Sequence, residues 1–239
     1  MRYLLGIQIL IISFISLVSD HAGAQVSKGN INFRKFQDKA YYFGLTFGYN
    51  HSNFQLQESK KFILNDSFNI TEGLGGPGLN VSMVTNMKLG DYFDFRFLPG
   101  FSFVGRKFFY VSTQDQIEDV KSIEGVLVQA PLQVRFKSEP FHDMRMFVLA
   151  GAKYTYDVAS NARIRKEQAN RIIRISPHDF SVEVGAGAQF FFPFFIFSPE
   201  IKFSQGIGNI LIYNNKLTQS TVLEKVLSRT LTLSLHFEG

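Results

Sequence analysis

Two side chains near the end of the sequence have the types that a hydrolytic site needs. Ser234 and His236 are two residues apart, so on a β-strand both side chains lie on the same face. A serine whose hydroxyl is deprotonated by a histidine is the nucleophile of many hydrolases. The sequence offers no evident third member of such a triad, and neighbouring positions on this face are also polar. We therefore interpret Ser234 and His236 as polar residues that face the interior of the fold.

Asp94 and Glu183 are candidates for a general acid and a general base, since a pair of carboxyl groups can share these roles. Both residues occur on strand-like segments that also carry Arg or Lys. A carboxylate beside a cation forms an ion pair and needs no catalytic role to explain it. We therefore predict ion pairs at these positions, and no enzymatic activity.

A metal or redox centre is not indicated by the sequence. The chain has no cysteine, which excludes disulfides, thiolate-bound zinc and cysteine nucleophiles. His51, His142 and His178 are scattered and do not have the i, i+4 spacing of a metal site on a helix. The glycine-rich segment 73–78 lacks the Lys-Ser/Thr pair of a phosphate-binding loop, so it is interpreted as a turn. No cofactor is predicted.

A basic segment between two strand-like runs is a candidate interaction patch. Arginine is suited to phosphate groups, so the patch could contact lipopolysaccharide, or it could contact a partner protein. A solvated loop without a ligand is the simpler alternative. The patch consists of Arg163, Arg165, Lys166, Arg171 and Arg174.

The strands that would position these residues are indicated by side chains whose polarity repeats every two residues. Apolar and polar side chains alternate in eight runs, each close to the 9 to 11 residues with which a tilted strand crosses a membrane. The 27 phenylalanines fall largely on the apolar sides of these runs. The runs are 41–50, 79–88, 93–103, 126–137, 144–157, 180–190, 195–203 and 230–237.

The connections between the runs decide the architecture. Long and short connections alternate, which places all short turns and both ends of the barrel on one side of a membrane. A β-sandwich has no reason to sort its loops in this way, and a soluble lipocalin-like barrel would have a polar outer face. The sequence therefore predicts an all-β fold, an eight-stranded antiparallel transmembrane β-barrel with short periplasmic turns and long extracellular loops.

Charged residues occur on the polar sides of these runs, which would face the barrel interior. An eight-stranded barrel is just wide enough for its interior to be filled by side chains. Because both signs of charge are present, we predict a packed ion-pair network and no open pore. We further predict that Pro131 and Pro199 introduce a bulge or bend. The predicted network comprises Asp94, Arg96, Arg135, Lys153, Glu183, Glu200 and Lys202.

The beginning of the chain has the features of an export signal. A positive residue, an apolar run and the small residues Ala22 to Ala24 predict a cleaved signal peptide over 1–24. The alternative is an uncleaved N-terminal anchor. A polar, flexible periplasmic lead is expected over 25–39, followed by the barrel domain over 40–239. The formal net charge of +5 is dispersed among both signs and does not indicate nucleic-acid binding.

Three segments carry a resemblance to a known family. The segments FGLTFGYNHSNF (43–54), VLVQAPLQVRFKS (126–138) and DFSVEVGAGAQFFFPFFIFSPEIKFSQGIGN (179–209) resemble the PorT family of outer-membrane β-barrels. The resemblance implies a role in the type IX secretion system, with gliding motility in motile species, and it implies no catalytic residues. In one departure, two residues follow Phe237, where the barrel-assembly signal usually ends on an aromatic residue.

Two functional hypotheses follow. In the first, the chain is a non-enzymatic outer-membrane component of protein secretion that acts on other secretion proteins. In the second, it is a generic eight-stranded barrel with a lipid-modifying or surface-binding role. In both, outer-membrane lipids and lipopolysaccharide are expected partners.

Overall fold

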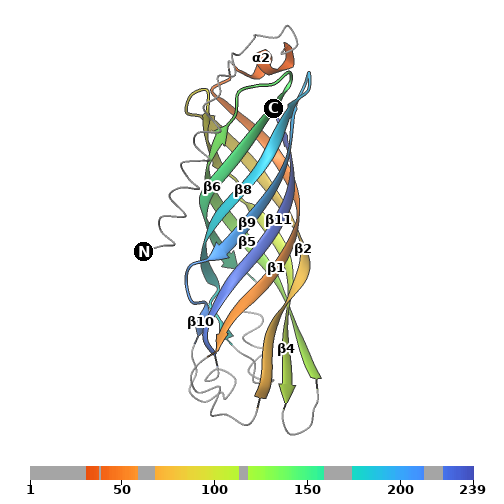
Figure 1. Ribbon diagram of the computed structural model, residues 1–239, viewed down its shortest axis with the longest axis vertical. Helices are drawn as coiled ribbons and strands as arrows, with labels where there is room; N and C mark the ends of the chain where they lie inside the picture. Colours follow the sequence, from red (N-terminus) through yellow and green to blue (C-terminus); the bar gives the residue numbers. More distant parts are fainter. Residues whose placement is uncertain (1–30, 38, 59–67, 113–117, 159–173, 213–222) are drawn as a thin grey trace, which may run out of the picture.

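The chain forms a closed antiparallel β-barrel in a computed structural model that describes residues 31–37, 39–58, 68–112, 118–158, 174–212 and 223–239 (Figure 1). Each strand of the ring pairs with its neighbours in the chain, and the first strand pairs with the last. The ring comprises β1 (Tyr41–Glu58), β2 (Phe68–Lys88), β3 (Phe93–Phe97), β4 (Gly100–Ser112), β5 (Glu118–Lys137), β6 (Met144–Asp157), β8 (His178–Phe191), β9 (Ile196–Gly206) and β11 (Leu223–Glu238).

β3 and β4 together form one strand of the ring. Phe97 pairs with Leu132 and Gly100 with Gln129, so the register on β5 continues unchanged across the break. The break falls at Leu98 and Pro99, opposite Pro131, and a proline has no N–H to donate to the ladder. The ring therefore has eight strands, and the predicted fold class is confirmed.

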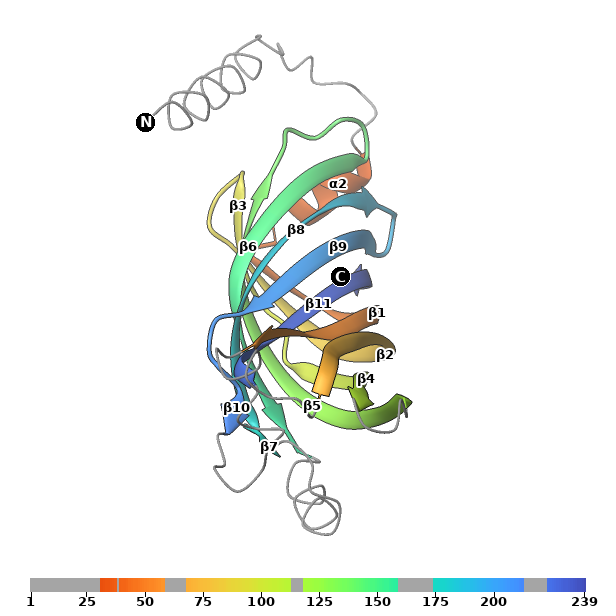
Figure 2. The same ribbon diagram turned by 60° about the horizontal axis from the view of Figure 1, so that its bottom comes forward.

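The ends of the barrel are sorted as predicted. The tight connections β2–β3, β5–β6 and β8–β9 lie at the same end as both barrel termini, where the Gly239 N–H donates to the carbonyl of Phe43 at 2.8 Å. The strand ends that the longer connections join lie at the opposite end (Figure 2). We refer to the first end as periplasmic and to the second as extracellular, following the arrangement of outer-membrane barrels.

The outward face of the strands is apolar and exposed. Along β1, the side chains of Tyr41, Phe43, Leu45, Phe47 and Tyr49 are all at least 49% exposed. Thr46 and Asn50, on the alternate positions of the strand, are buried. This alternation covers about the 25 Å of an outer-membrane apolar band, because a strand rises about 3.3 Å per residue and is tilted. The phenylalanines of this strand therefore lie on the outward positions that were predicted to face lipid.

The strands are longer than predicted. β2 has 21 residues and β5 has 20, about twice the length that crosses the membrane. The glycine-rich segment predicted to be a turn is part of β2, where the pairing to β4 shifts register between Gly75 and Gly78. The prediction of a turn was therefore wrong: the segment is strand with a register shift, and glycine tolerates the local backbone conformations of a bulge.

The two prolines expected to bend the barrel do not shift its register. Pro131 pairs with Lys153 and Pro199 pairs with Leu235, within ladders that continue in the same register on both sides. The prediction for these positions was a bulge or a bend, and the continuous register excludes the bulge. At Pro131 the effect is the interruption between β3 and β4, because Pro131 has no N–H to donate to the opposite strand.

At the extracellular end, the β6–β8 and β9–β11 connections are joined by a short two-stranded ladder. β7 (Arg174–Ile175) pairs with β10 (Leu211–Ile212). Beneath this pair, Phe54 of β1, Ile210 and Val226 of β11 form a small buried apolar cluster. The extracellular end therefore carries a small apolar cluster built partly from residues of its connections.

At the periplasmic end, part of the lead is helical. Helix α2 (Ile31–Gln37) lies across the mouth. Its Phe33 and Phe36 side chains are 8% and 4% exposed, and they form a buried apolar cluster with Tyr42, Phe191 and Ile196. The Asp143 carboxylate accepts hydrogen bonds from the backbone N–H groups of Asn32 and Phe33, at 3.1 Å each. The lead predicted to be flexible over 25–39 thus contains a docked helix.

The helical part of the chain does not suggest a helical membrane span. Within the described ranges, no helix has both the length and the apolar character that a transmembrane helix requires.

Docking of α2 should depend on its two phenylalanines, because a seven-residue helix is too short to be stable in isolation. We expect Phe36→Ala to release the helix and to abolish amide protection over residues 31–37 in hydrogen exchange. Phe194→Ala is the matched control, since Phe194 at the same end is 87% exposed. Unchanged protection in Phe36→Ala would show that burial of Phe36 is not needed to hold α2 in place.

Candidate functional site

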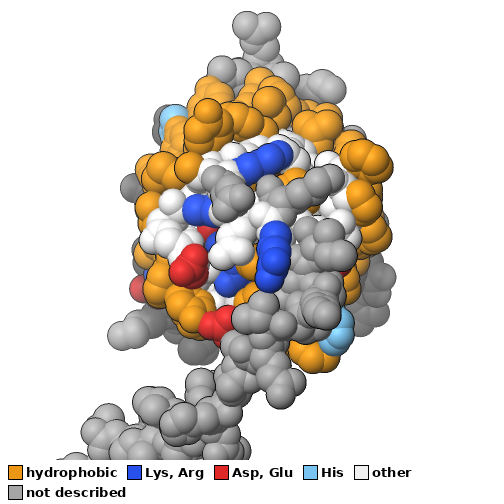
Figure 3. Space-filling model, turned by 90° about the horizontal axis from the view of Figure 1, so that it is seen from above, with side chains coloured by type: hydrophobic (Ala, Val, Ile, Leu, Met, Phe, Trp, Pro, Cys, Tyr) orange, Lys and Arg blue, Asp and Glu red, His pale blue; other side chains and the backbone are white. Residues whose placement is uncertain are grey.

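The polar residues of the barrel interior form the most organised arrangement of functional groups in the described chain. Viewed from the periplasmic end, apolar side chains form the rim and charged side chains gather inside it (Figure 3). The structure places all seven residues of the predicted charge set on inward positions, each at most 8% exposed. They are contributed by β3, β5, β6, β8 and β9, so the set exists only in the closed barrel.

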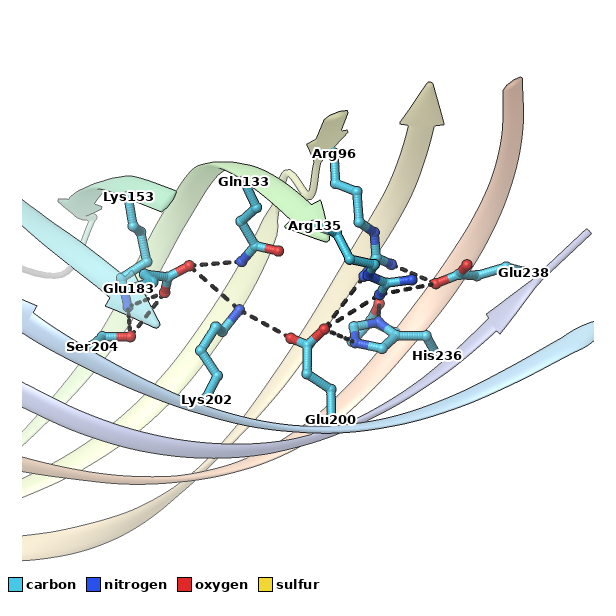
Figure 4. A network of polar contacts seen from close by, with 11 residues as sticks. Arg96, Gln133, Arg135, Lys153, Glu183, Glu200, Lys202, Ser204, His236 and Glu238 are labelled. Carbon is cyan, nitrogen blue, oxygen red and sulfur yellow. Dashed lines mark hydrogen bonds and ion pairs between the residues drawn. The ribbon is translucent and has the colours of Figure 1, made fainter. Parts of the chain in front are cut away.

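Glu200 on β9 lies at the centre of this arrangement (Figure 4). Its Oε2 is 3.4 Å from Arg96 Nη1 and 3.4 Å from Arg135 Nη2. The same oxygen is 3.3 Å from His236 Nε2, and Oε1 is 3.8 Å from Lys202 Nζ. One carboxylate therefore contacts four basic side chains that come from β3, β5, β9 and β11.

Glu238, next to the C-terminal residue, is a second carboxylate of the network that the sequence reasoning missed. Its Oε1 is 2.5 Å from Arg96 Nη2 and 3.9 Å from Arg135 Nη2, and its side chain is fully buried. The sequence reasoning ended the last strand at Phe237. The alternation itself continues through His236 to Glu238, so the signal that Glu238 faces inward was present.

A second group of contacts surrounds Glu183 on β8. Lys153 Nζ lies 3.2 Å from Oε1, and Lys202 Nζ lies 3.5 Å from Oε2. The Gln133 amide donates to Oε2 at 2.8 Å, and the Ser204 hydroxyl donates to Oε1 at 2.8 Å. Lys202 contacts both Glu183 and Glu200, so it joins the two groups into one network.

Asp94 forms a third group nearer the periplasmic mouth. Lys137 Nζ donates to its Oδ1 at 2.5 Å, and the Tyr42 hydroxyl donates to its Oδ2 at 3.4 Å. Tyr42 also packs against Phe36 of α2 in the apolar cluster at the mouth. Tyr42 therefore connects the apolar cluster beneath the docked helix with the interior ion pairs.

Tyr92 lies at the same mouth, outside the membrane-spanning strands, and the pKa of its phenol is raised. The Tyr92 hydroxyl donates a hydrogen bond to the Glu139 carboxylate, and this bond raises the pKa of Tyr92 above its usual value. The interaction links the β2–β3 turn to the β5–β6 turn, so it ties two periplasmic turns together.

Small and aromatic inward residues shape the space around the charges. A Cβ at Gly151 would lie 2.3 Å from the Leu132 carbonyl oxygen and 2.9 Å from Gln133 Cγ, so glycine leaves room for the Gln133 side chain. The Arg135 guanidinium lies 3.7 Å from the centre of the Phe147 ring, which faces inward and is 3% exposed. Sequence reasoning missed Phe147, because it lies in a continuous apolar run.

The candidate catalytic residues do not form an accessible site. Ser234 and His236 both face inward, at 1% and 0% exposure. His236 Nδ1 lies 2.6 Å from the hydroxyl of Thr46, so it is Thr46 and not Ser234 that shares a hydrogen bond with this ring. Asp94 and Glu183 belong to separate groups of ion pairs. These residues form internal contacts that neither lipid nor solvent reaches.

A comparison with protein families agrees with the geometry. A family model described as "Outer membrane protein beta-barrel domain" matches residues 24–211. The chain belongs to this family. Its barrel therefore lies in the outer membrane of a bacterium, where the apolar band contacts lipid.

Solved outer-membrane barrels have a similar fold at low sequence identity. The chain is similar to Ail of Yersinia pestis, with 13% identity, a TM-score of 0.36, and coverage of 84% of this chain and 100% of that chain. It is similar to OprG of Pseudomonas aeruginosa, with 9% identity, a TM-score of 0.44, and coverage of 83% of this chain and 95% of that chain. It is also similar to Neisserial surface protein A, with 9% identity, a TM-score of 0.42, and coverage of 82% of this chain and 96% of that chain. No curated protein matches the chain.

The remaining predicted residues are dispersed in this barrel. His51 lies beside Gly75, His142 lies in the β5–β6 turn with a φ of 55°, and His178 Nδ1 is 2.7 Å from the Tyr154 hydroxyl. Among the residues that the structure describes, no three His, Asp or Glu side chains are grouped as a metal site would require. Of the predicted loop patch, Arg163, Arg165, Lys166 and Arg171 lie outside the described residues, and Arg174 is described only as part of the backbone of β7.

Proposed function

We propose that the protein is a non-enzymatic outer-membrane component of protein secretion by the type IX secretion system, with a contribution to gliding motility in motile species. The proposal combines the resemblance to the PorT family with one structural observation. The interior of this outer-membrane barrel is occupied by a buried network of ion pairs centred on Glu200. A barrel filled in this way is suited to act through its two ends.

The network argues against a conducting role. Arg96, Arg135 and Glu200 contact one another inside the barrel, and their side chains are fully buried. An ion that crossed the barrel would have to separate these buried pairs, and breaking one costs about 3–5 kcal/mol. Passage of a folded or unfolded polypeptide through the interior would require the whole network to come apart.

The interior contacts also argue against the lipid-modifying alternative. An enzyme that acts on membrane lipid needs its nucleophile at the lipid-facing surface or at the mouth, within reach of a substrate. The Ser234 and Thr46 hydroxyls are buried inside the barrel instead. We therefore assign no catalytic residues and no cofactor.

The surfaces left for function are the two ends. We propose that the signal peptide is cleaved near Ala24, and that other secretion proteins bind the periplasmic lead or the extracellular loops. The basic segment 163–174 is our candidate for contacts with lipopolysaccharide or with a partner protein, because arginine forms two-pronged contacts with phosphate and carboxylate groups. Nucleic acid is not a proposed partner.

A complementation experiment tests the proposal. In a deletion strain, we expect loss of secreted cargo that returns with the wild-type gene and with Ser234→Ala or His236→Gln. Neutralising Arg163, Arg165, Lys166, Arg171 and Arg174 together should impair secretion while the barrel still folds, because loop residues contribute little to the strand ladder.

The migration of unheated and boiled samples on gels provides the folding control for each variant. Normal cargo secretion in the deletion strain would contradict the proposal. If Ser234→Ala abolished activity in a folded barrel while the loop variant behaved as wild type, a lipid-hydrolase role would replace it.

A further inference from the structure

The outward face of the barrel changes from apolar to polar near its extracellular end. On β11 the outward series of leucines is followed by Arg229, and on β9 an outward phenylalanine is followed by Gln205. On β1 the outward Tyr49 is followed by polar residues as far as Gln55. This transition marks the level of the headgroups in the outer leaflet, since the apolar band of such barrels ends there.

Three polar side chains are organised at this level. Arg229 Nη2 donates to Gln55 Oε1 at 2.9 Å, and Arg229 Nε donates to Gln205 Oε1 at 3.2 Å. The Gln205 amide also donates to Gln55 Oε1, at 3.4 Å. The three strands β1, β11 and β9 are adjacent in the sheet, so Arg229 is held in the middle by an amide on each side.

The positive charge of Arg229 has no acidic partner among the described residues. Both of its hydrogen-bond acceptors are neutral amides, and its side chain is exposed. Most other cations on the described strands lie in the barrel interior, where they contact carboxylates. Arg229 is therefore a fixed cation whose charge remains available to a ligand outside the protein.

The surroundings of Arg229 fit a ligand that has both a charged and an apolar part. The guanidinium carbon lies 5.9 Å from the centre of the Phe203 ring, on the side toward the apolar band. Leu231, two residues further along β11 toward the apolar band and on the same face, is 49% exposed. A molecule with an anionic head and acyl chains would place the head at Arg229 and the chains over Phe203 and Leu231.

We propose that Arg229, Gln55 and Gln205 form a binding site for a phosphorylated glycolipid of the outer leaflet. Guanidinium groups bind phosphate through charge-assisted hydrogen bonds, which are about twice as strong as neutral ones. Gln55 and Gln205 hold the guanidinium in place before the ligand arrives, which reduces the side-chain entropy lost on binding. This site is separate from the loop segment 163–174, and it depends on the outer-membrane location but not on a role in secretion.

The test uses the full-length protein in detergent micelles and native mass spectrometry, with purified bis-phosphorylated lipid A as the probe. We expect lipid A to bind about tenfold more tightly than its dephosphorylated form, which corresponds to about 1.4 kcal/mol. Arg229→Gln should weaken lipid A binding by about the same factor. Arg229→Lys, which keeps the charge but not the planar fork, should give an intermediate value.

Arg34→Gln is the matched control, because Arg34 is an exposed cation on α2 at the opposite end of the barrel. It should leave lipid A binding unchanged. Equal binding of the phosphorylated and dephosphorylated lipids would overturn the proposal, as would equal losses in Arg229→Gln and Arg34→Gln. Competition by inorganic phosphate at the same concentration as lipid A would indicate a soluble anion instead of a lipid. If Arg229→Gln does not fold, Arg229→Lys and the comparison of the two lipids still decide the question.

Discussion

Replacing Glu200 by leucine is expected to lower the free energy of unfolding of the barrel by about 3–5 kcal/mol. The substitution removes one carboxylate that contacts Arg96, Arg135, Lys202 and His236. The two arginines would then share only Glu238, at 2.5 Å and 3.9 Å. Burying a cation without an opposite charge carries a desolvation cost that leucine cannot offset by its own burial.

The isosteric variant Glu200→Gln separates the effect of charge from that of volume. It keeps the size of the side chain and can still accept a hydrogen bond, so its destabilisation reports the lost charge. Glu224→Gln is the matched control, since the Glu224 side chain is exposed on β11 and a surface substitution changes stability by about 0.5 kcal/mol or less.

Urea unfolding in detergent, followed by circular dichroism, measures these differences; the chain has no tryptophan for fluorescence. The shift between unheated and boiled samples on gels provides an independent check of folding. If Glu200→Gln proved as stable as Glu224→Gln, the negative charge of Glu200 would contribute nothing net to the stability of the barrel.

The face on which each interior residue lies could be predicted from the sequence, but its partner could not. The period of two depends only on backbone geometry, so it placed Asp94, Arg96 and Glu200 on inward positions without knowledge of the tertiary structure. The contact between Arg96 and Glu200 joins residues 104 positions apart in the chain. It depends on how far each strand is staggered against the next, and the alternation within single strands carries no information on that stagger.

The features that sequence reasoning missed have specific causes. Phe147 lies on an inward position within the apolar run from Met146 to Ala150, where alternation of polarity is lost. Helix α2 is too short to show a helical period, and its only signal is the pair Phe33 and Phe36, three residues apart in a polar lead. Its first residues donate hydrogen bonds to Asp143, which is more than 100 residues away in the sequence. Such contacts emerge only when the barrel closes.

The closing seam between the first and last strands gives the second large expected effect. Gly44 on β1 pairs with Glu238 on β11. A Cβ at position 44 would lie 2.4 Å from the Phe237 carbonyl oxygen and 2.9 Å from Glu238 Cα. Both are backbone atoms of the paired strand, so no side-chain rotation can relieve the contact, and the two strands would have to move apart.

We expect Gly44→Ala to destabilise the barrel by about 1–3 kcal/mol, the range for overpacking, and Gly44→Val to prevent closure. Gly105→Ala is the matched control within a strand, because the nearest atom to its added Cβ is the Pro77 carbonyl oxygen at an ordinary 3.4 Å. Urea unfolding measures the alanine variants, and the loss of the fast-migrating unheated band on gels reports failed closure in Gly44→Val.

The seam and the interior network are linked through Glu238, because its Cγ would lie 3.0 Å from the Cβ at position 44. Gly44→Ala should therefore also disturb the Glu238 contact with Arg96, and its effect should be smaller in a Glu238→Gln background, where that ion pair is already absent. Equal stability of Gly44→Ala and Gly105→Ala would mean that β1 and β11 can separate without cost. In that case, the close pairing of β1 with β11 would not be the cause of the contact between Glu238 and Arg96.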